Sequence, residues 1–308
     1  MKAVYSDAEE FYTKELLSDL RKLEIIRVKQ LLRQVYILVA LIVAFVGGML
    51  LFNPFFILVI LMILLGVYVI IFGRKRQRLD FKKGYKQLFL DKASSFLLPK
   101  HEFQANRYLK ADDCVDSHIL EMPADDMEGE GLVSGHIFGA KVTMSELHTR
   151  ERERHADGSV TYTTLFHGML LRTELPQSHT GRNFLFVDND ERFRNHFNEQ
   201  TSDINTLQPE PVHKELTSSL GLELLSTEDA IPESYLKDCL AVVADFYRSR
   251  PDGCRFYWSG KELFMAFHFP KGMLKPSVYR SVMKSDDSAY FVSCMQVAST
   301  MIRLFSGS

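Results

Sequence analysis

The chain carries one long apolar run inside an otherwise mixed pattern of hydrophobic and polar residues. No Asp, Glu, Lys or Arg occurs from Val35 to Gly73. One straight helix of that length would be about 58 Å long, nearly twice the ~30 Å hydrocarbon core of a bilayer. The run therefore predicts two membrane-spanning helices, residues 35–52 and 55–73, that form a transmembrane hairpin.

The pair Asn53-Pro54 separates the two predicted spans. A proline disfavours helical geometry in the residue before it, and asparagine tolerates the geometry of a turn. We therefore place the reversal of the hairpin at this pair. The alternatives are one long proline-kinked helix and two core helices of a soluble protein. Hydrophobic mismatch and the absence of a polar face oppose both alternatives.

Residues 1–34 have the pattern of an amphipathic helix. Charged residues separate apolar positions that recur every three to five residues, namely Phe11, Leu16, Leu20, Leu23, Ile26 and Leu31. We expect this helix to continue into the first span without a break. Its apolar stripe has three possible partners, which are the membrane surface, another helix and the folded domain.

Basic residues flank both ends of the apolar run, whereas the turn between the spans carries no charge. The positive-inside rule then places both termini in the cytoplasm, which predicts a multi-pass protein of the bacterial inner membrane. The four cysteines lie far apart and form no C-x-x-C pair. Their spacing agrees with reduced thiols in the cytosol and not with a disulfide framework.

The segment that follows the spans divides into residues 74–121, predicted as a basic juxtamembrane helix and linker, and residues 122–308, predicted as a cytoplasmic domain. The basic residues of 74–86 have two explanations, attraction to anionic lipid headgroups and a topology signal alone, and the topology signal is sufficient to explain them. The chain has 37 basic and 39 acidic residues, of which 14 basic and 7 acidic residues precede residue 87. The remaining 23 basic and 32 acidic residues give the segment from residue 87 onward a net charge of −9. This balance opposes binding to nucleic acid.

The pattern within the cytoplasmic domain predicts an α+β fold in which an antiparallel sheet packs with helices. We expect an acidic loop, five strands and two helices, in the following order: loop 122–131, strands 132–154 and 159–175 joined at Asp157-Gly158, a third strand in 183–190, helix 232–250, two short strands within 254–270 that meet around Gly260, and helix 285–305.

No template for catalysis or metal binding fits the chain. The P-loop and the G-x-S-x-G elbow are absent, and Gly135 with Gly139 is better explained by a bulge or a close backbone approach than by a dinucleotide site. His148 and His155 bracket an alternating charge run, where solvated strand residues are a better explanation than a metal site. A solvated turn likewise explains Asp188, Asp190 and Glu191 better than a cation site.

His167 is the strongest single candidate for a catalytic residue, because it is polar and lies within the apolar strand LFHGMLL. A polar group in such a strand must find a partner or face solvent. A structural histidine with a satisfied partner is the simpler explanation. The sequence therefore predicts no catalytic, cofactor-binding or metal-binding residue.

Two blocks of sequence carry a resemblance to a known family. They are VSGHIFGAKVTMSELHTRE, which contains Gly135, Ser145 and Glu146, and LFHGMLLRTEL, which contains Phe166, His167 and Gly168. Together with Tyr85-Lys86 and the stretch from Glu215 to Phe246, they resemble the bacterial membrane-protein family called domain of unknown function 3137. In that family the position of His167 is more often lysine. The resemblance implies the same membrane topology and fold, and it implies no activity.

The sequence therefore favours a membrane-anchored cytoplasmic domain that binds or regulates another protein. Its expected partners are membrane lipids, through the two spans and the basic segment, and one further protein. The alternative is a membrane-tethered hydrolase whose site is assembled in space around His167, Asp188 or a neighbouring acid. A transporter or channel subunit is disfavoured, because neither span contains an ionisable residue.

Overall fold

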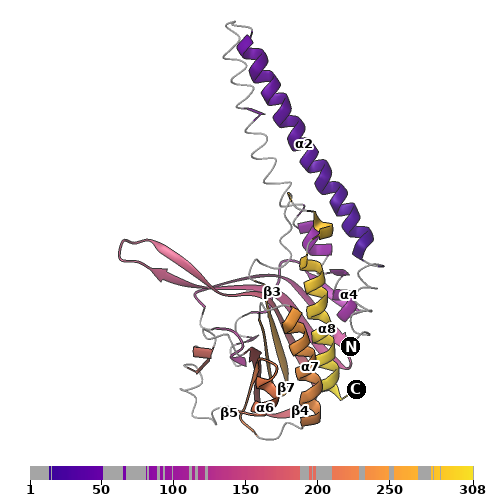
Figure 1. Ribbon diagram of the computed structural model, residues 1–308, viewed down its shortest axis with the longest axis vertical. Coiled ribbons are helices and arrows are strands. Elements are labelled where there is room, and N and C mark those ends of the chain that lie inside the picture. Colours follow the sequence, from indigo (N-terminus) through magenta and orange to yellow (C-terminus); the bar gives the residue numbers. More distant parts are fainter. Residues whose placement is uncertain are drawn as a thin grey trace. The chain divides into compact units, whose positions relative to one another are not determined.

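The computed structural model has two compact units, whose elements are drawn in Figure 1. The helical unit comprises Glu9–Leu88 and Leu274–Asp286, and the α+β unit comprises Met1–Ala8, Phe89–Met273 and Asp287–Ser308. The structure describes residues 14, 16–50, 65–66, 81, 83–88, 91–92, 94–98, 100–110, 113–114, 117–121, 124–187, 194–195, 197–198, 210–228, 233–249, 253–269, 279, 281–284 and 286–307.

The main element of the helical unit is helix α2, Leu17–Leu50. It runs without a break from the amphipathic segment into the apolar run, so the predicted continuity is confirmed for the residues that the structure describes. In its first half, the Glu24 carboxylate accepts hydrogen bonds from the Arg27 guanidinium at 2.6 and 2.9 Å. The same carboxylate accepts the backbone N–H of Val282 at 3.0 Å, which ties α2 to the short 3-10 helix η5, Val282–Lys284.

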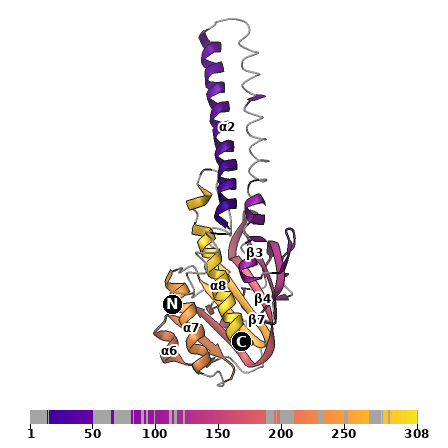
Figure 2. The ribbon, with the colours of Figure 1, turned by 90° about the vertical axis from the view of Figure 1, so that its right-hand side faces the viewer.

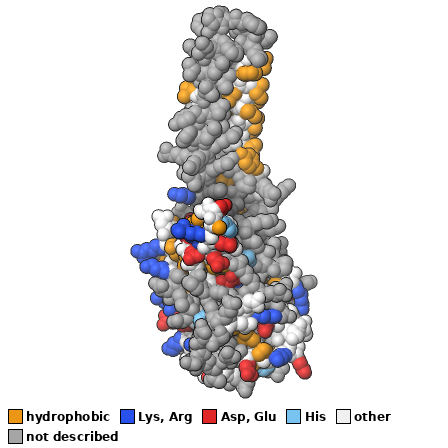
Figure 3. Space-filling model, turned by 90° about the vertical axis from the view of Figure 1, so that its left-hand side faces the viewer, with side chains coloured by type: hydrophobic (Ala, Val, Ile, Leu, Met, Phe, Trp, Pro, Cys, Tyr) orange, Lys and Arg blue, Asp and Glu red, His pale blue; other side chains and the backbone are white. Residues whose placement is uncertain are grey.

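The second half of α2 exposes apolar side chains. Between residues 35 and 46, eight large hydrophobic side chains are 46% to 71% exposed (Val35, Tyr36, Leu38, Val39, Ile42, Val43, Phe45 and Val46), and Figure 3 shows some of this apolar surface. Of the described residues, one helix is long and apolar enough to cross a membrane, and it is this one. The predicted turn at Asn53-Pro54 lies outside the described residues, as does most of the predicted second span.

Two residues of the second apolar run are described, Leu65 and Gly66, and both are helical. Gly66 lies against α2, since a methyl group built on its Cα would come within 2.8 Å of Leu41 Cδ2. The absence of a side chain at Gly66 therefore allows this close contact, as small residues do at many helix interfaces in membranes.

Among the described residues, the α+β unit is built on one antiparallel sheet of seven strands, so the predicted α+β class is confirmed. The strands follow the order β1-β2-β3-β4-β6-β5, and β7 also pairs with β4. Their bounds are His101–Gln104 (β1), Asp126–Ile137 (β2), Ala140–Arg154 (β3), Val160–Val187 (β4), Glu210–Pro211 (β5), Leu222–Ser226 (β6) and Cys254–His268 (β7). The short helices α4, Ser94–Leu97, and α6, Lys214–Ser218, lie outside the sheet.

The start of the sheet differs from our expectation. The segment predicted as one strand, 132–154, is two strands, because the chain reverses at Phe138 and Gly139, which have φ values of 51° and 76°. Two consecutive residues with positive φ form the tight turn of a hairpin. Part of the predicted acidic loop, residues 126–131, belongs to β2. Strand β1 also lies in the segment 74–121 that we had assigned to a helix and linker.

The predicted hairpin at Asp157-Gly158 is confirmed, and it joins β3 to β4. Gly158 has a φ of 80°, and the Asp157 carboxylate accepts the N–H of Ser159 at 2.8 Å. The predicted third strand, by contrast, is not separate, because its residues 183–187 continue β4. The two short strands expected around Gly260 are likewise one strand, β7, whose pairing with β4 shifts register near Gly260, where φ is 55°.

Two long helices cover one face of the sheet, as Figures 1 and 2 show. They are α7, Glu233–Ser249, and α8, Asp286–Ser306, and both agree with the predicted helices. Phe267 of β7 meets Phe246 of α7 at a ring distance of 5.6 Å, and Phe246 stacks on Tyr290 of α8 at 5.7 Å. Asp286 and Asp287 favour the start of α8 electrostatically, and Gly307, with a φ of 69°, follows its end.

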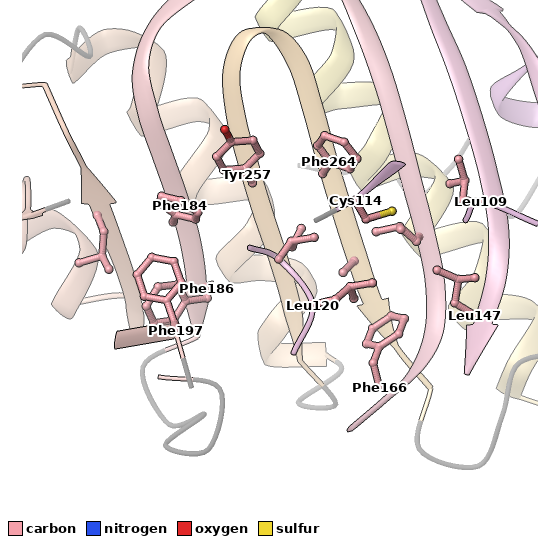
Figure 4. Close-up of a cluster of buried hydrophobic side chains, with 14 residues drawn as sticks. Leu109, Cys114, Leu120, Leu147, Phe166, Phe184, Phe186, Phe197, Tyr257 and Phe264 are labelled. Atoms are coloured by element: carbon pink, nitrogen blue, oxygen red, sulfur yellow. The ribbon is translucent and has the colours of Figure 1, made fainter. Parts of the chain in front are cut away.

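The opposite face of the sheet is buried as well. Alternate residues of the strands point there, and Figure 4 shows the resulting apolar cluster. Phe184 of β4 lies 4.9 Å from the ring of Tyr257 of β7 and 4.7 Å from that of Phe197. Leu109 and Leu120, from the chain that precedes β2, cover the cluster. The central strands therefore have apolar layers on both faces.

The four cysteines are free and buried, which agrees with the expectation of reduced thiols. Burial raises the pKa of Cys114, Cys239 and Cys254 to about 12. An ordinary thiol, with a pKa of about 8.5, is partly ionised at pH 8, whereas a thiol with this raised pKa stays protonated and unreactive.

We therefore expect the folded protein to resist a charged disulfide reagent at pH 8 and to react fully in denaturant. The measurement is the absorbance of the thiol product before and after unfolding. Fast reaction of several thiols in the folded protein would contradict the burial of these side chains.

Candidate functional site

Strands β3 and β4 bring two histidines and a glutamate together on the sheet. His148 pairs directly with His167 across the two strands, and Glu146 lies two residues before His148, hence on the same face. The imidazole rings of His148 and His167 stack with centroids 4.2 Å apart and an angle of 13° between their planes. His167 is therefore placed by the strand pairing, and not by a loop.

The Glu146 carboxylate is the polar partner of His167. Its Oε1 lies 3.3 Å from His167 Nε2, and the exposed fractions of the two residues are 4% and 6%. On the other side of the stack, His148 Nε2 lies 3.1 Å from Thr164 Oγ1. The buried imidazole thus has a carboxylate and an aromatic neighbour, which satisfies its polar and apolar parts together.

This geometry is typical of a structural histidine. No group of three or more ligating side chains in the described parts of the chain has the geometry of a metal site. Removing one member of such a buried pair is costly, because the other is left without its partner in a place that water does not reach. The burial of His167 also weakens the hydrolase interpretation, which requires the imidazole to reach a substrate.

The other candidate residues are not gathered at this site. His155 lies at the tip of the β3–β4 hairpin, where its Nε2 is 2.7 Å from Thr161 Oγ1. It is seven residues beyond His148 along an extended chain, or about 23 Å at about 3.3 Å per residue. The two imidazoles are therefore too far apart to ligate one metal ion. Asp188, Asp190 and Glu191 lie outside the described residues.

Most of the residues that carry the family resemblance have packing roles around the same strands. Ser145 Oγ accepts the backbone N–H of Leu109 at 3.0 Å, and Phe166 belongs to the apolar cluster. Gly168 lies so close to β7 that a methyl group on its Cα would overlap the carbonyl oxygen of Phe267. Gly135 is similar, since a methyl group there would lie 2.9 Å from the carbonyl oxygen of Lys100.

A second feature is a two-stranded arm, defined as residues 150–164, in which the end of β3 pairs with the start of β4. Figure 1 shows the arm projecting from the sheet, and every residue from Glu151 to Thr164 is exposed. Arg150 anchors its base through Asp126 and Glu128, and the Arg150 guanidinium lies 5.4 Å from the ring of Tyr162.

The two edges of the arm differ in chemistry. The β3 edge has the alternating charges of Glu151, Arg152, Glu153 and Arg154, and the N–H of Arg152 is bonded to the Asp125 carboxylate at 2.8 Å. The β4 edge, residues 160–164, has the uncharged sequence VTYTT. Strand β7 pairs with β4 only from Gly168 onward, so in the described part of the chain no strand covers this edge.

The charge pattern predicted a solvated hairpin end, but the uncovered β4 edge was not predicted. The signal was available, because a run of β-branched and aromatic residues beside a charge-alternating strand is typical of an uncovered edge. The contact between Glu146 and His167 was also missed, and it depends on the register of the strands.

No family model matches the chain, and no curated protein matches it. Among solved structures, the crystal structure of the mycobacterial trehalose monomycolate transport factor A, TtfA, is similar with a TM-score of 0.34 and 9% sequence identity. The similarity covers 73% of this chain and 96% of that one. Because this TM-score is low, the likeness transfers neither fold nor function.

The role of Gly168 can be tested with a single methyl group. Gly168→Ala forces β4 away from β7, and we expect it to lower the free energy of unfolding by about 3 kcal/mol, as overpacked core substitutions do. Gly84→Ala is the control, because nothing lies within 4 Å of the added methyl group and alanine favours a helix. Chemical denaturation followed by circular dichroism measures both. Equal stability of the two variants would contradict the close approach.

The Glu146–His167 pair can be tested with a double-mutant cycle. We expect Glu146→Leu and His167→Leu each to cost about 3 kcal/mol or more, because each removes a hydrogen-bonding partner of a buried polar group. The double variant should cost less than the sum by about 1 to 3 kcal/mol. The control cycle uses Arg172 and Glu262, whose side chains are 2.5 Å apart but roughly 40% exposed, and it should show a coupling below about 1 kcal/mol. Additive costs at the buried pair would show that the two side chains do not interact.

Proposed function

We propose that this chain is a multi-pass protein of the bacterial inner membrane, whose α+β unit binds or regulates another protein at the cytoplasmic surface. The transmembrane hairpin has spans 35–52 and 55–73, and both termini are cytoplasmic. Membrane lipids are its partners through the spans and the basic segment 74–86. The resemblance to the family of domain of unknown function 3137 agrees with this proposal and remains a prediction.

The exposed apolar surface of α2 carries the proposal. Eight large hydrophobic side chains in a stretch of twelve residues are about half exposed. In water, such a patch is unfavourable by roughly 25 cal/mol for each Å² of apolar area. In a bilayer, the same side chains contact lipid hydrocarbon chains that are also apolar. The charges of α2 lie before residue 34, so the charged half remains outside the hydrocarbon core.

The contact between Leu41 and Gly66 supports the hairpin. Leu41 lies twelve residues before Asn53, and Gly66 lies twelve residues after Pro54. Residues at equal distances from the turn of an antiparallel helix pair lie side by side, which is the relation that these two residues have. The contact is therefore what a reversal at Asn53-Pro54 requires.

The arm supports the role in protein interaction. It is exposed on both faces, it has an uncovered strand edge, and it lies in a unit whose best candidate for catalysis, His167, is buried. Proteins commonly bind an extended segment by adding a strand to such an edge. The net charge of −9 beyond residue 86 opposes a nucleic-acid partner.

The membrane placement is tested with an enzyme that is active only outside the inner membrane. We expect activity when it is inserted between Asn53 and Pro54 and no activity when it is fused after Ser308, because the basic flanks keep both termini inside. Fusion abundance on immunoblots is the control. Strong activity from the C-terminal fusion would overturn the topology.

The binding role is tested separately, by placing a photo-crosslinking residue on the arm at Thr163 in living cells. A reproducible protein adduct, identified by mass spectrometry, is the expected result. The matched control is the same residue at Lys141, which is exposed on β3 but outside the arm. No adduct from the arm, or the same adducts from both positions, would count against a binding role for the arm.

A further inference from the structure

We propose that the β4 edge of the arm, residues 160–164, pairs antiparallel with the same edge of a second copy of this chain. The inference deepens the proposed function by naming one partner of the arm, and it rests on that proposal for the arm's role in binding. Such a pair joins two hairpins into a four-stranded ribbon.

The outer β4 edge of the arm is available for pairing. In a sheet, each uncovered strand presents unpaired N–H and C=O groups that another strand can bind. On the β3 side of the arm, the Asp125 carboxylate already occupies the N–H of Arg152. On the β4 side, no strand in the described parts of the chain pairs with the outer edge of 160–164.

The same edge also carries exposed apolar side chains. In the described part of the α+β unit, three large hydrophobic side chains are exposed, namely Phe138, Val160 and Tyr162. Two of the three lie on this edge, with exposed fractions of 38% for Val160 and 49% for Tyr162. Pairing of the edge with another strand would cover both.

The side-chain pattern of this edge is compatible with two-fold symmetry. An antiparallel pair centred on Tyr162 places Tyr162 opposite the Tyr162 of the second copy, and each Thr161 opposite a Thr163. Val160 then lies opposite Thr164, so all five residues of the edge are paired. Aromatic and β-branched residues directly opposite one another stabilise an antiparallel pair.

The β3 edge of the arm cannot pair favourably with the β3 edge of a second copy about a two-fold axis. A pair centred on Arg152 would place Glu151 opposite Glu153 and Arg150 opposite Arg154. Like charges directly opposite one another destabilise a sheet. Because the pattern of β4 is self-compatible and that of β3 is not, a second copy fits one edge and is excluded from the other.

The expected strength follows from the size of the edge. Five paired residues bury less than the roughly 1,200 Å² of a stable interface, so the pair is weak for molecules free in solution. Anchoring both copies in one membrane raises their effective concentration and favours association without new contacts. We therefore expect to detect the dimer in membranes, where both copies are anchored.

The test is disulfide trapping of the full chain in isolated membranes. Tyr162→Cys brings two thiols opposite one another, with Cα atoms about 4.5 to 5.5 Å apart, within the range of a disulfide. The matched control is Arg152→Cys, since residue 152 pairs with residue 162 across the arm and is also exposed. In the proposed dimer the two copies of residue 152 are separated by three strand spacings, about 14 Å.

After mild oxidation, we expect at least ~10-fold more covalent dimer from Tyr162→Cys than from Arg152→Cys, because disulfides require Cα atoms closer than about 7 Å. The unmodified chain should give none, since its four cysteines are buried. Equal trapping of the two variants, trapping of Arg152→Cys alone, or no trapping above the unmodified chain would overturn the proposal.

A charge test fixes the register. In the Tyr162→Cys background, Thr161→Lys with Thr163→Lys places two lysines opposite one another, and we expect trapping to be lost. Within one arm these lysines face Glu153 and Glu151, so the arm itself is not destabilised. Thr161→Lys with Thr163→Glu places opposite charges together between the two copies. Glu151→Lys is added to this variant, so that residue 163 again faces an opposite charge within its own arm, and we expect trapping to be restored. If the two sets of substitutions give equal amounts of covalent dimer, the register is wrong and the dimer as proposed is rejected.

The outcomes separate this inference from the proposed function. If trapping fails while the arm still gives a reproducible photo-adduct with a different protein, the second copy is rejected and the binding role stands. If both fail while the reporter confirms the topology, the arm is rejected as a binding surface and the membrane anchor stands.

Discussion

Strand β4 is the element on which the rest of the α+β unit depends, because its backbone must find hydrogen-bonding partners along 28 residues. Its middle pairs with β3 on one side and β7 on the other, and its end pairs with β6 and β7. Gly168 permits this arrangement, since it lets the backbone of β7 approach β4 closely. Where β4 has partners on both sides, most of its side chains from Gly168 to Thr173 are buried. Where it has β3 alone, it becomes the exposed arm.

The sequence predicted those parts of the fold that depend on local chemistry. Pro232 and Pro251 bracket α7, and the turn at Asp157-Gly158 joins β3 to β4, so both elements were predicted with nearly correct ends. The turn at Phe138-Gly139 was missed, because a phenylalanine with a φ of 51° is uncommon and the flanking residues read as one apolar run. Strand β1 was missed because four residues are too few to show a period.

The candidate site was less predictable than the fold, because it depends on a one-residue shift in the pairing of β3 with β4. Counting outward from the turn at Asp157-Gly158 would place His148 opposite Phe166. The register shifts by one residue between Thr149 and Arg150, so His148 meets His167 instead. A one-residue shift moves every later side chain of the strand to the other face. Nothing in the local sequence marks this bulge, and the approach of Glu146 to His167 follows from it.

The contrast between the two edges of the arm limits how the chain can assemble. An exposed strand edge ordinarily risks growth into an open sheet, since each added copy presents a new edge. Pairing of two β4 edges about a two-fold axis is isologous, so it uses the same surface of both copies. What then remains exposed on either side is a β3 edge with the alternating charges of residues 151–154 and with Arg152 held by Asp125. Because that edge repels a copy of itself, association through the arm ends at two chains.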